Sequence, residues 1–243
     1  MRRPKVDLWI LGLGIRGLKQ VTVETLEVLE RCRIVLHLTQ QHEELSRINP
    51  RLVDLEEAYW TGEERGVVYE RLVRRVLAEV ARGPEVALVS YGHPMIFDDV
   101  TLALVRRSKR RGLCCRVLPA VSCLDTLCID LGIDYGYGLQ VFEATTLVTH
   151  RQPLRPEVDA LVLQLGEFGT DRTADAVPNH PGRFAPLVDH LTRFYPGDHR
   201  AVIAFSDDGE IAKPRLLRTR IDQLDAHARG IFPGVTLYLP AAR

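Results

Sequence analysis

The sequence predicts an α/β fold made of two closely packed domains. Between residues 6 and 119, short apolar runs typical of buried strands alternate with stretches whose apolar residues recur at helical spacing. This β-α-β-α order is typical of a mostly parallel sheet with helices on its faces. After Pro119 the pattern changes, yet strands and helices continue to the end of the chain. We therefore expect domains at 1–119 and 120–243, packed closely because no linker separates them.

In the first domain, each element is predicted from its apolar pattern. Residues 22–31 form a helical stripe, and the stretch from Thr22 to Thr25 resembles a capping box at its start. A stronger amphipathic stripe covers residues 69–82. The remaining predictions are strands at 6–11, 34–38, 52–55, 85–90 and 115–119, and a helix at 100–109.

The second domain begins with a predicted helix at 122–131 and a turn-rich stretch at 132–138. Residues 169–183 are polar and contain Gly and Pro, which predicts a loop. The other predicted elements are strands at 139–144, 161–166, 201–205 and 235–240, and a helix at 187–194.

The composition disfavours several classes of protein. The 32 basic and 32 acidic side chains cancel, which argues against nucleic-acid binding through bulk charge. No apolar run approaches the roughly 18 residues of a membrane span, and no secretory cleavage site follows the basic start. The five cysteines and eight histidines show no metal-ligand spacing. We expect a cytoplasmic protein with reduced thiols and with no metal, nucleic-acid or membrane partner.

The turn after the first predicted strand, Gly12–Gly17, has the form GxGxxG. In dinucleotide-binding proteins, such glycines bring the backbone close to a pyrophosphate at a helix N-terminus. Here the predicted helix starts later, near Thr22, and the strand at 34–38 ends without the expected acidic residue. Both features argue against an NAD-binding dehydrogenase.

Two polar stretches carry the residues best suited to chemistry. The first holds Tyr59, Arg65 and Tyr69, and the second, 91–99, follows the next predicted strand. Arg65 and Tyr69 are four apart, so they share one face of a helix. A guanidinium beside a phenol favours the phenolate and lowers the phenol pKa from about 10. The alternative is packing, with the tyrosines half-buried and Arg65 paired with a neighbouring glutamate.

Four motifs together resemble the tetrapyrrole methylase superfamily of S-adenosylmethionine-dependent methyltransferases. They occur in the family order over nearly the whole chain and are Gly12-Leu13-Gly14, Gly92-His93-Pro94, Leu118-Pro119-Ala120-Val121-Ser122 and Leu237-Tyr238-Leu239-Pro240. The resemblance implies two α/β domains of tetrapyrrole methylase type with the cofactor cleft between them. It also implies S-adenosylmethionine as cofactor and S-adenosylhomocysteine as its product.

Within that superfamily, the chain resembles the borosin-type peptide backbone N-methyltransferases. These enzymes have a Gly-His-Pro loop where porphyrinoid methylases usually have Gly-Gly-Asp-Pro. They also carry a tyrosine, an arginine six residues later and a tyrosine four later, the spacing of Tyr59, Arg65 and Tyr69. Fungal fused enzymes continue into an extension that ends in the peptide they methylate, whereas this sequence stops soon after its last predicted strand. It therefore resembles the split form, which acts on a separate precursor peptide.

Backbone N-methylation needs a base for the amide N–H proton and donors for the carbonyl oxygen. With the resemblance in place, we assign Tyr69 as the base. Arg65 tunes that phenol and holds the amide oxygen, and Tyr59 is a second donor to the same oxygen.

The resemblance places the cofactor-binding residues in both domains. Gly92 and Pro94 shape a loop that a bulky ligand can approach closely. Ser122 and Cys123, at a helix start, can present backbone N–H groups to the methionine carboxylate. His93 has an alternative role as a loop residue bonded to backbone. The full set is Gly12, Tyr91, Gly92, His93, Pro94, Ile96, Phe97, Ser122, Cys123, Gln164, Leu165 and Thr236.

The predicted partners are a precursor peptide supplied in trans and a second copy of the chain in a homodimer. Two alternatives stay open. One is a methyltransferase for a tetrapyrrole or another small molecule, and the other is a non-catalytic regulator that binds S-adenosylmethionine.

Overall fold

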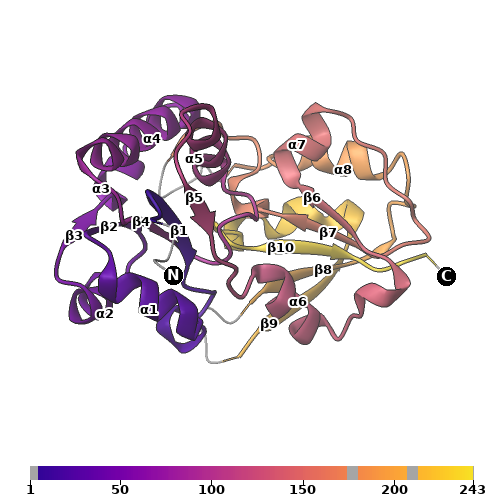
Figure 1. The fold of residues 1–243 in the computed structure, drawn as a ribbon. Coiled ribbons are helices and arrows are strands. Elements are labelled where there is room, and N and C mark those ends of the chain that lie inside the picture. The colour runs from indigo at the N-terminus through magenta and orange to yellow at the C-terminus, as the bar shows by residue number, and fades with distance from the viewer. Residues whose placement is uncertain (1–4, 174–179, 207–212, 243) are drawn as a thin grey trace. The chain divides into compact units, whose positions relative to one another are not determined.

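The computed structural model describes residues 5–173, 180–206 and 213–242, and the chain forms two compact units (Figure 1). The first unit comprises Met1–Asp125 and Asp171–Asp175, and the second comprises Thr126–Thr170 and Ala176–Arg243. Each unit has its own five-stranded sheet, so the predicted α/β class is confirmed. The domain boundary predicted at residues 119–120 stays a prediction.

The sheet of the first unit is parallel in all its described pairs and has the order β3-β2-β4-β1-β5. Its strands are β1 (Leu8–Gly12), β2 (Ile34–Leu38), β3 (Leu52–Asp54), β4 (Val86–Ser90) and β5 (Cys115–Val117). Its helices are η1 (Gly17–Lys19), α1 (Val23–Arg31), α2 (His42–Ile48), α3 (Glu56–Tyr59), α4 (Arg65–Arg82) and α5 (Asp99–Arg110).

Both faces of this sheet are covered. Successive side chains of a strand point to opposite faces. Leu8 and Ile10 of β1 belong to the apolar cluster formed with α4 and α5, whereas Trp9 and Leu11 belong to the cluster formed with α1 and α2. Figure 1 shows these two helix pairs on opposite sides of the sheet. Burial on both sides explains why the strands read as continuous apolar runs.

Helices α1 and α4 begin with different kinds of hydrogen bond, the first local and the second to a residue distant in sequence. The Thr22 hydroxyl accepts from the Thr25 N–H at 3.1 Å, which confirms the predicted cap of α1. The predicted start of the next long helix at Tyr69 is wrong, because α4 begins at Arg65. Its first N–H group donates outside the helix, from Arg65 to the Asp171 carbonyl at 2.6 Å. A partner so distant in sequence leaves no local signal.

The sheet of the second unit has the order β6-β7-β10-β8-β9, with β6 and β7 parallel and the other pairs antiparallel. Its strands are β6 (Gln140–Glu143), β7 (Ala160–Leu163), β8 (Arg200–Phe205), β9 (Arg215–Arg220) and β10 (Thr236–Leu239). The helices that follow the first unit's sheet are α6 (Cys123–Leu131), η2 (Tyr135–Tyr137), α7 (Ala144–Thr149), η3 (Leu165–Glu167), α8 (Ala185–Leu191) and η4 (Ile221–Gly230). Residues 174–179 of the predicted 169–183 loop lie outside the described residues.

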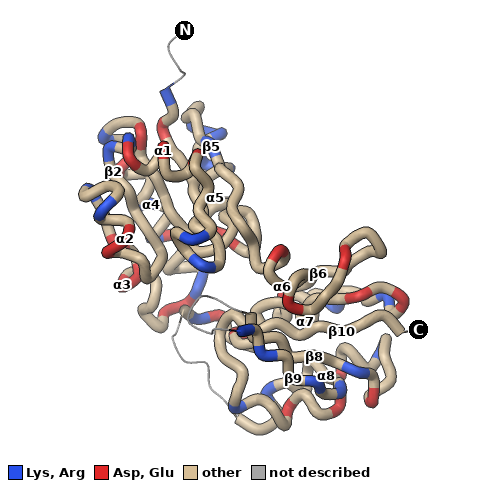
Figure 2. The backbone as a smooth tube through the Cα atoms, turned by 90° about the horizontal axis from the view of Figure 1, so that it is seen from below, with Lys and Arg blue, Asp and Glu red and all other residues tan. Residues whose placement is uncertain are grey.

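Basic and acidic residues both occur along the backbone of each unit (Figure 2), in keeping with a formal net charge of zero. Among the described residues, no helix is both long enough and apolar enough to cross a membrane.

Candidate functional site

The two glycine-containing loops of the first unit meet beyond the ends of neighbouring parallel strands, β1 and β4. Gly14 donates its N–H to the Gly92 carbonyl at 3.3 Å, and Gly92 returns a hydrogen bond to the Gly14 carbonyl at 3.1 Å. Ligands of open α/β sheets bind beyond the carboxyl ends of the strands. The structure therefore brings Gly12 and the predicted Gly92-His93-Pro94 loop together in the region where a ligand is expected.

Glycine is required at two positions of this junction for different reasons. A Cβ added to Gly12 would lie 2.2 Å from the Gly92 carbonyl oxygen and 2.8 Å from Pro94 Cδ. Gly92 has φ +68°, a left-handed conformation that disfavours other residues. The close packing of the two loops therefore depends on both glycines.

The GxGxxG stretch differs from a dinucleotide site in its contacts. The Gln20 side-chain oxygen accepts from the Ile15 and Arg16 N–H groups, each at 2.8 Å. Helix α1 begins only at Val23, several residues after Gly17. The amides that would meet a pyrophosphate are engaged by Gln20, and the helix N-terminus lies elsewhere in sequence. Both observations agree with the sequence argument against a dehydrogenase.

The rest of the 91–97 loop presents large side chains to solvent. Tyr91 is 55% exposed and Phe97 is 42% exposed. His93 Nδ1 accepts from the Met95 N–H at 3.1 Å, which is the backbone-bonded role named as its alternative. Ile96 completes the turn by donating its N–H to the His93 carbonyl. The loop thus pairs an ordered backbone with exposed aromatic rings.

At the start of α6, Ser122 and Asp125 cap each other. The Ser122 N–H and hydroxyl both donate to the Asp125 carboxylate at 2.6 Å, and the hydrogen bond from the hydroxyl contributes most to lowering the pKa of Asp125. A ligand carboxylate at the Ser122 amide would therefore compete with Asp125. The Ser-x-x-Asp spacing is a capping-box signal that could have identified Asp125 from the sequence.

Burial raises the pKa of the Cys123 thiol to about 11. The thiol is consequently protonated near neutral pH, and a thiolate nucleophile is disfavoured. Its side chain is suited to packing.

The cofactor residues predicted in the second unit lie where η3 meets β10. Gln164 adopts a left-handed conformation, with φ +56°, just after β7. The next residue, Leu165, is buried and donates its N–H to the Val235 carbonyl at 3.0 Å. Val235 directly precedes Thr236, which is itself only 3% exposed. This hydrogen bond ties the chain around Gln164 to the residue that precedes β10.

The predicted catalytic residues lie on two consecutive helices. Tyr59 ends α3, Arg65 begins α4, and Tyr69 lies one turn further along α4. The two phenolic oxygens are 3.4 Å apart, and the rings stack with centroids 6.0 Å apart. All three side chains are partly buried. The fold thus brings the tyrosines together, with Arg65 on the helix face that carries Tyr69.

Arg71 braces this arrangement, and the sequence analysis did not identify it. Its guanidinium donates to the Glu63 carboxylate at 2.7 Å and also to the Ala58 carbonyl and the Thr61 hydroxyl, at 3.2 and 3.3 Å. These bonds link α4 to the end of α3 and to the loop between them. Arg71 is therefore a positioning residue for Tyr59, which directly follows Ala58.

A segment distant in sequence, Asp171–Thr173, pairs with the loop that enters α4; we call it the clasp. Gly62 N–H donates to the Thr173 carbonyl at 2.8 Å, and Thr173 N–H donates to the Glu63 carbonyl at 3.1 Å. The Arg172 guanidinium adds a bond to the Gly62 carbonyl at 2.8 Å. The clasp fixes where α4 begins and therefore where Arg65 stands.

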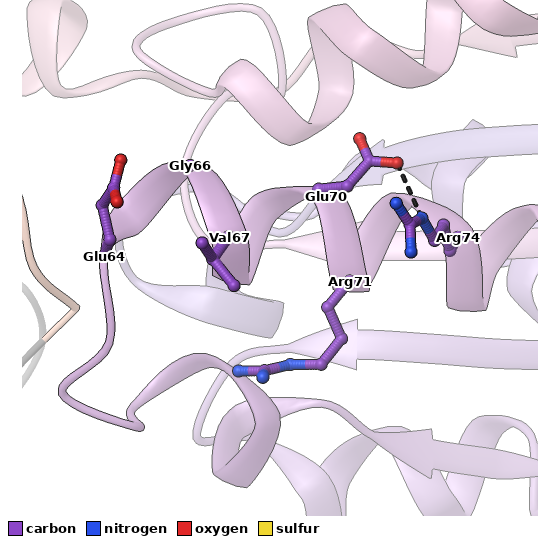
Figure 3. Close-up of a pocket in the computed structure, with 6 residues that line it drawn as sticks. All are labelled: Glu64, Gly66, Val67, Glu70, Arg71 and Arg74. Carbon is purple, nitrogen blue, oxygen red and sulfur yellow. Dashed lines mark hydrogen bonds and ion pairs between the residues drawn. The ribbon is translucent and has the colours of Figure 1, made fainter.

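One face of α4 carries an open pocket of about 570 Å³ (Figure 3). It is lined by Glu64, Gly66, Val67, Glu70, Arg71 and Arg74. Glu70 bonds Arg74 at 2.8 Å and Arg107 of α5 at 3.0 Å, so this part of the lining is held in place. Val67, by contrast, is 53% exposed. The pocket thus combines fixed charges with apolar surface beside the helix turn that carries Arg65 and Tyr69.

The sequence matches the family model described as Tetrapyrrole (Corrin/Porphyrin) Methylases over residues 7–225. This match covers most of the chain and includes strands of both sheets.

Two relatives are similar over 96% of the chain. One is the methyltransferase/ribosomally synthesized cyclic peptide gymnopeptides precursor of Gymnopus fusipes, at 28% identity. The other is the methyltransferase/ribosomally synthesized type I borosin cyclic peptide precursor of Coprinopsis marcescibilis, also at 28% identity. The chain spans 57% and 62% of the lengths of these two proteins.

Among solved structures, uroporphyrin-III C-methyl transferase from Thermus thermophilus, complexed with S-adenyl homocysteine, has a similar fold. The TM-score is 0.63 at 17% sequence identity, and the similarity covers 96% of each chain.

Proposed function

The chain belongs to the tetrapyrrole (corrin/porphyrin) methylase family, and from that membership we propose that it is an S-adenosylmethionine-dependent methyltransferase acting on a ribosomally made peptide. The reaction we propose is methylation of backbone amide nitrogen, with the peptide supplied in trans. The methyltransferase and peptide-precursor names of its relatives support this choice of acceptor.

The observation that carries the proposal is the arrangement of Tyr59 and Tyr69, with hydroxyls 3.4 Å apart and Arg65 one turn before Tyr69. An amide nitrogen is a poor nucleophile while its lone pair is delocalised into the carbonyl. A base must take its proton, and donors must stabilise the charge that moves to the oxygen. Two phenols and a guanidinium provide one base and two donors.

The residue roles follow from that chemistry. Tyr69, as phenolate, takes the N–H proton of the peptide. Arg65 and Tyr59 donate hydrogen bonds to the amide oxygen as its negative charge develops. Catalytic groups accelerate a reaction most when they are held in position before the substrate arrives. The hydrogen bonds from Arg71 to Ala58 and Thr61 contribute by fixing α3 and α4 relative to each other.

The residues proposed to bind S-adenosylmethionine in the first unit combine tightly packed backbone with exposed aromatic rings. At the Gly12–Gly92 junction the two loops pack backbone against backbone, and Tyr91 and Phe97 offer exposed rings for an adenosine or an aliphatic chain. S-adenosylmethionine supplies an activated methyl group when bound. Gly12, the 91–97 loop and Ser122 would hold it in the first unit, and Gln164, Leu165 and Thr236 are its proposed contacts in the second. The predicted homodimer belongs to the same proposal.

The test is to incubate the purified chain with S-adenosylmethionine and a peptide encoded beside its gene that has an apolar C-terminal segment. We expect added masses of one methylene per methyl group, and tandem mass spectrometry should place them on backbone nitrogens. An unmodified peptide, together with methylation of uroporphyrinogen, would overturn the choice of acceptor. Cofactor binding without methylation of either acceptor would favour a regulator.

A further inference from the structure

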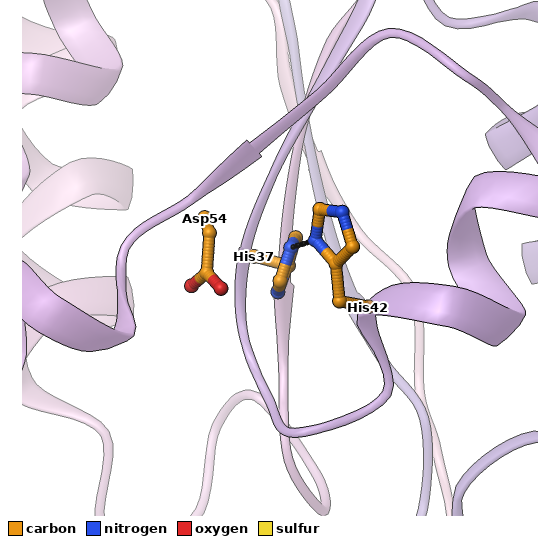
Figure 4. A group of neighbouring side chains, drawn as sticks. All are labelled: His37, His42 and Asp54. Atoms are coloured by element: carbon orange, nitrogen blue, oxygen red, sulfur yellow. Dashed lines mark hydrogen bonds between the residues drawn. The ribbon is translucent and has the colours of Figure 1, made fainter.

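A cluster of three possible metal ligands lies in the first unit, apart from the residues assigned to methyl transfer. It consists of His37 on β2, His42 at the start of α2 and Asp54 at the end of β3 (Figure 4). One ligand atom from each residue lies within 4.8 Å of the other two. The sequence predicted no metal because these residues have no recognised ligand spacing.

The fold explains how they meet. Strands β2 and β3 are parallel neighbours in which His37 and Asp54 are register partners. After β2 the chain turns through Thr39 and enters α2, which returns His42 to the same sheet edge. Strand pairing therefore brings Asp54 close to His37, and one short turn brings His42 close to both.

The hydrogen bonds of His37 orient its ring. His37 is fully buried, and its Nδ1 lies 3.2 Å from the Thr39 carbonyl, which can only accept. The Nδ1 atom therefore carries the proton and Nε2 keeps its lone pair.

The two other residues complete an open set of donors. His42 Nδ1 lies 2.9 Å from His37 Nε2, and the rings are tilted by 52° rather than stacked. One Asp54 oxygen accepts from the Glu56 N–H at 2.8 Å, which holds the carboxylate at the start of α3. His42 and Asp54 are exposed, so an ion can enter from solvent.

We propose that His37 Nε2, His42 Nδ1 and an Asp54 carboxylate oxygen bind a divalent transition ion of the zinc class. Two imidazoles and one carboxylate are borderline donors that suit such ions, with water completing the coordination. Ligand bonds of about 2.0–2.1 Å require the two nitrogens to separate slightly from their present contact. His42 can retreat because it is exposed, and its ring proton then resides on Nε2.

The site has a structural consequence that does not depend on the proposed methyl transfer. A bound ion would join β2, α2 and β3 at one point. Because the Asp54 carboxylate accepts from the Glu56 N–H, the ion would also stabilise the start of α3, the short helix that ends at Tyr59.

The experiment uses the full chain after chelation and dialysis. Titration with Co²⁺ should give visible absorption bands of a low-coordinate ion at one equivalent, and Zn²⁺ should remove them. Isothermal titration with Zn²⁺ should show one site that His42→Ala and Asp54→Asn weaken more than about 100-fold, because loss of outer-shell partners alone costs about 10–100-fold. Asn keeps an acceptor oxygen for the Glu56 N–H, and circular dichroism checks that both variants fold.

Two control variants test whether Zn²⁺ binds at this site or at an exposed histidine or cysteine elsewhere in the chain. His150→Ala removes an exposed histidine elsewhere, and Cys114→Ser removes the exposed thiol. Both should bind Zn²⁺ like the parent chain. The proposal is overturned if the parent chain binds no Zn²⁺ or Co²⁺, if binding survives in His42→Ala, or if Cys114→Ser abolishes it. The first of these outcomes would leave a hydrogen-bonded histidine pair.

Discussion

The phenolic oxygens of Tyr59 and Tyr69 lie 3.4 Å apart although the two residues belong to different helices. A hydrogen bond between phenols can stabilise one of them as phenolate while the other donates. This contact links the predicted base to one of the two predicted oxyanion donors.

Replacing Tyr69 by Phe removes the proposed base and keeps the ring that packs beside Tyr59. We expect turnover to fall about 10²–10⁴-fold, the usual contribution of general-base catalysis, with cofactor affinity unchanged. Peptide methylation followed by mass spectrometry and calorimetry with S-adenosylmethionine would measure the two effects. Tyr137→Phe, at a tyrosine that is 91% exposed, is the matched control. Normal turnover in Tyr69→Phe would rule out the assignment.

Gly12→Ala should damage the loop junction. The new methyl group would lie 2.2 Å from the Gly92 carbonyl oxygen, a backbone atom that can move only with its loop. We expect a loss of about 1–3 kcal/mol in the free energy of unfolding and weaker binding of S-adenosylmethionine. Urea denaturation and calorimetry measure these quantities. At Gly230, an added Cβ meets nothing within 4 Å, so Gly230→Ala should change neither. Equal behaviour of the two variants would contradict the packing argument.

The ion pair of Glu70 with Arg107 and Arg74 predicts a pH-dependent stability. Hydrogen bonds from these arginines, Arg107 first, lower the pKa of Glu70 from 4.5 to about 2. Stabilisation from a depressed carboxyl pKa is fully present above the unfolded value and is lost as pH falls through the folded value. The stability difference between the parent chain and Glu70→Gln should therefore shrink between pH 4.5 and 2.

Urea denaturation of both proteins at pH 7, 4 and 3 would measure this difference. It should be modest even at pH 7, because solvent screens exposed pairs. A difference that stays constant over the whole range would show that Glu70 does not titrate as described.

Asn49→Ala should destabilise the first unit. The buried Asn49 amide donates to the Leu29 and Cys32 carbonyls at 2.8 and 2.9 Å, which closes the C-terminal end of α1. Alanine leaves both carbonyls without these donors, at a cost of about 1–3 kcal/mol per unsatisfied group. Thermal or urea unfolding would measure the loss. Ser46→Ala, which removes a bond near the surface to Glu43, should change stability far less.

Helices and strands were predictable where the apolar pattern of the sequence matches the burial of the element in the fold. The strand predicted at 34–38 coincides with β2, because a strand buried on both faces needs an unbroken apolar run. Helix α3, at Glu56–Tyr59, is too short to show a helical period. Strand β9, at Arg215–Arg220, is largely exposed and carries three arginines, so it lacks the alternation of a half-buried strand.

The candidate site also has some features that the sequence predicts and others that it does not. The spacing of Tyr59, Arg65 and Tyr69 could be read from the chain, because the three residues lie within two consecutive helices. The brace from Arg71 depends on a loop conformation, and the meeting of His37 with Asp54 depends on strand register. Neither relationship has a fixed spacing in sequence, so both arise only in the folded chain.

The clasp has a consequence for how the protein is made. Arg172 bonds to Gly62 across 110 residues of chain. Ribosomes add roughly 5–20 residues per second, so the stretch that completes the entrance to α4 is translated on the order of ten seconds after Gly62. The nascent amino-terminal half can form its parallel sheet before that time, but the helix bearing Arg65 and Tyr69 gains its final contacts late. Final placement of the predicted catalytic residues on this helix therefore waits for a segment translated 110 residues after Gly62.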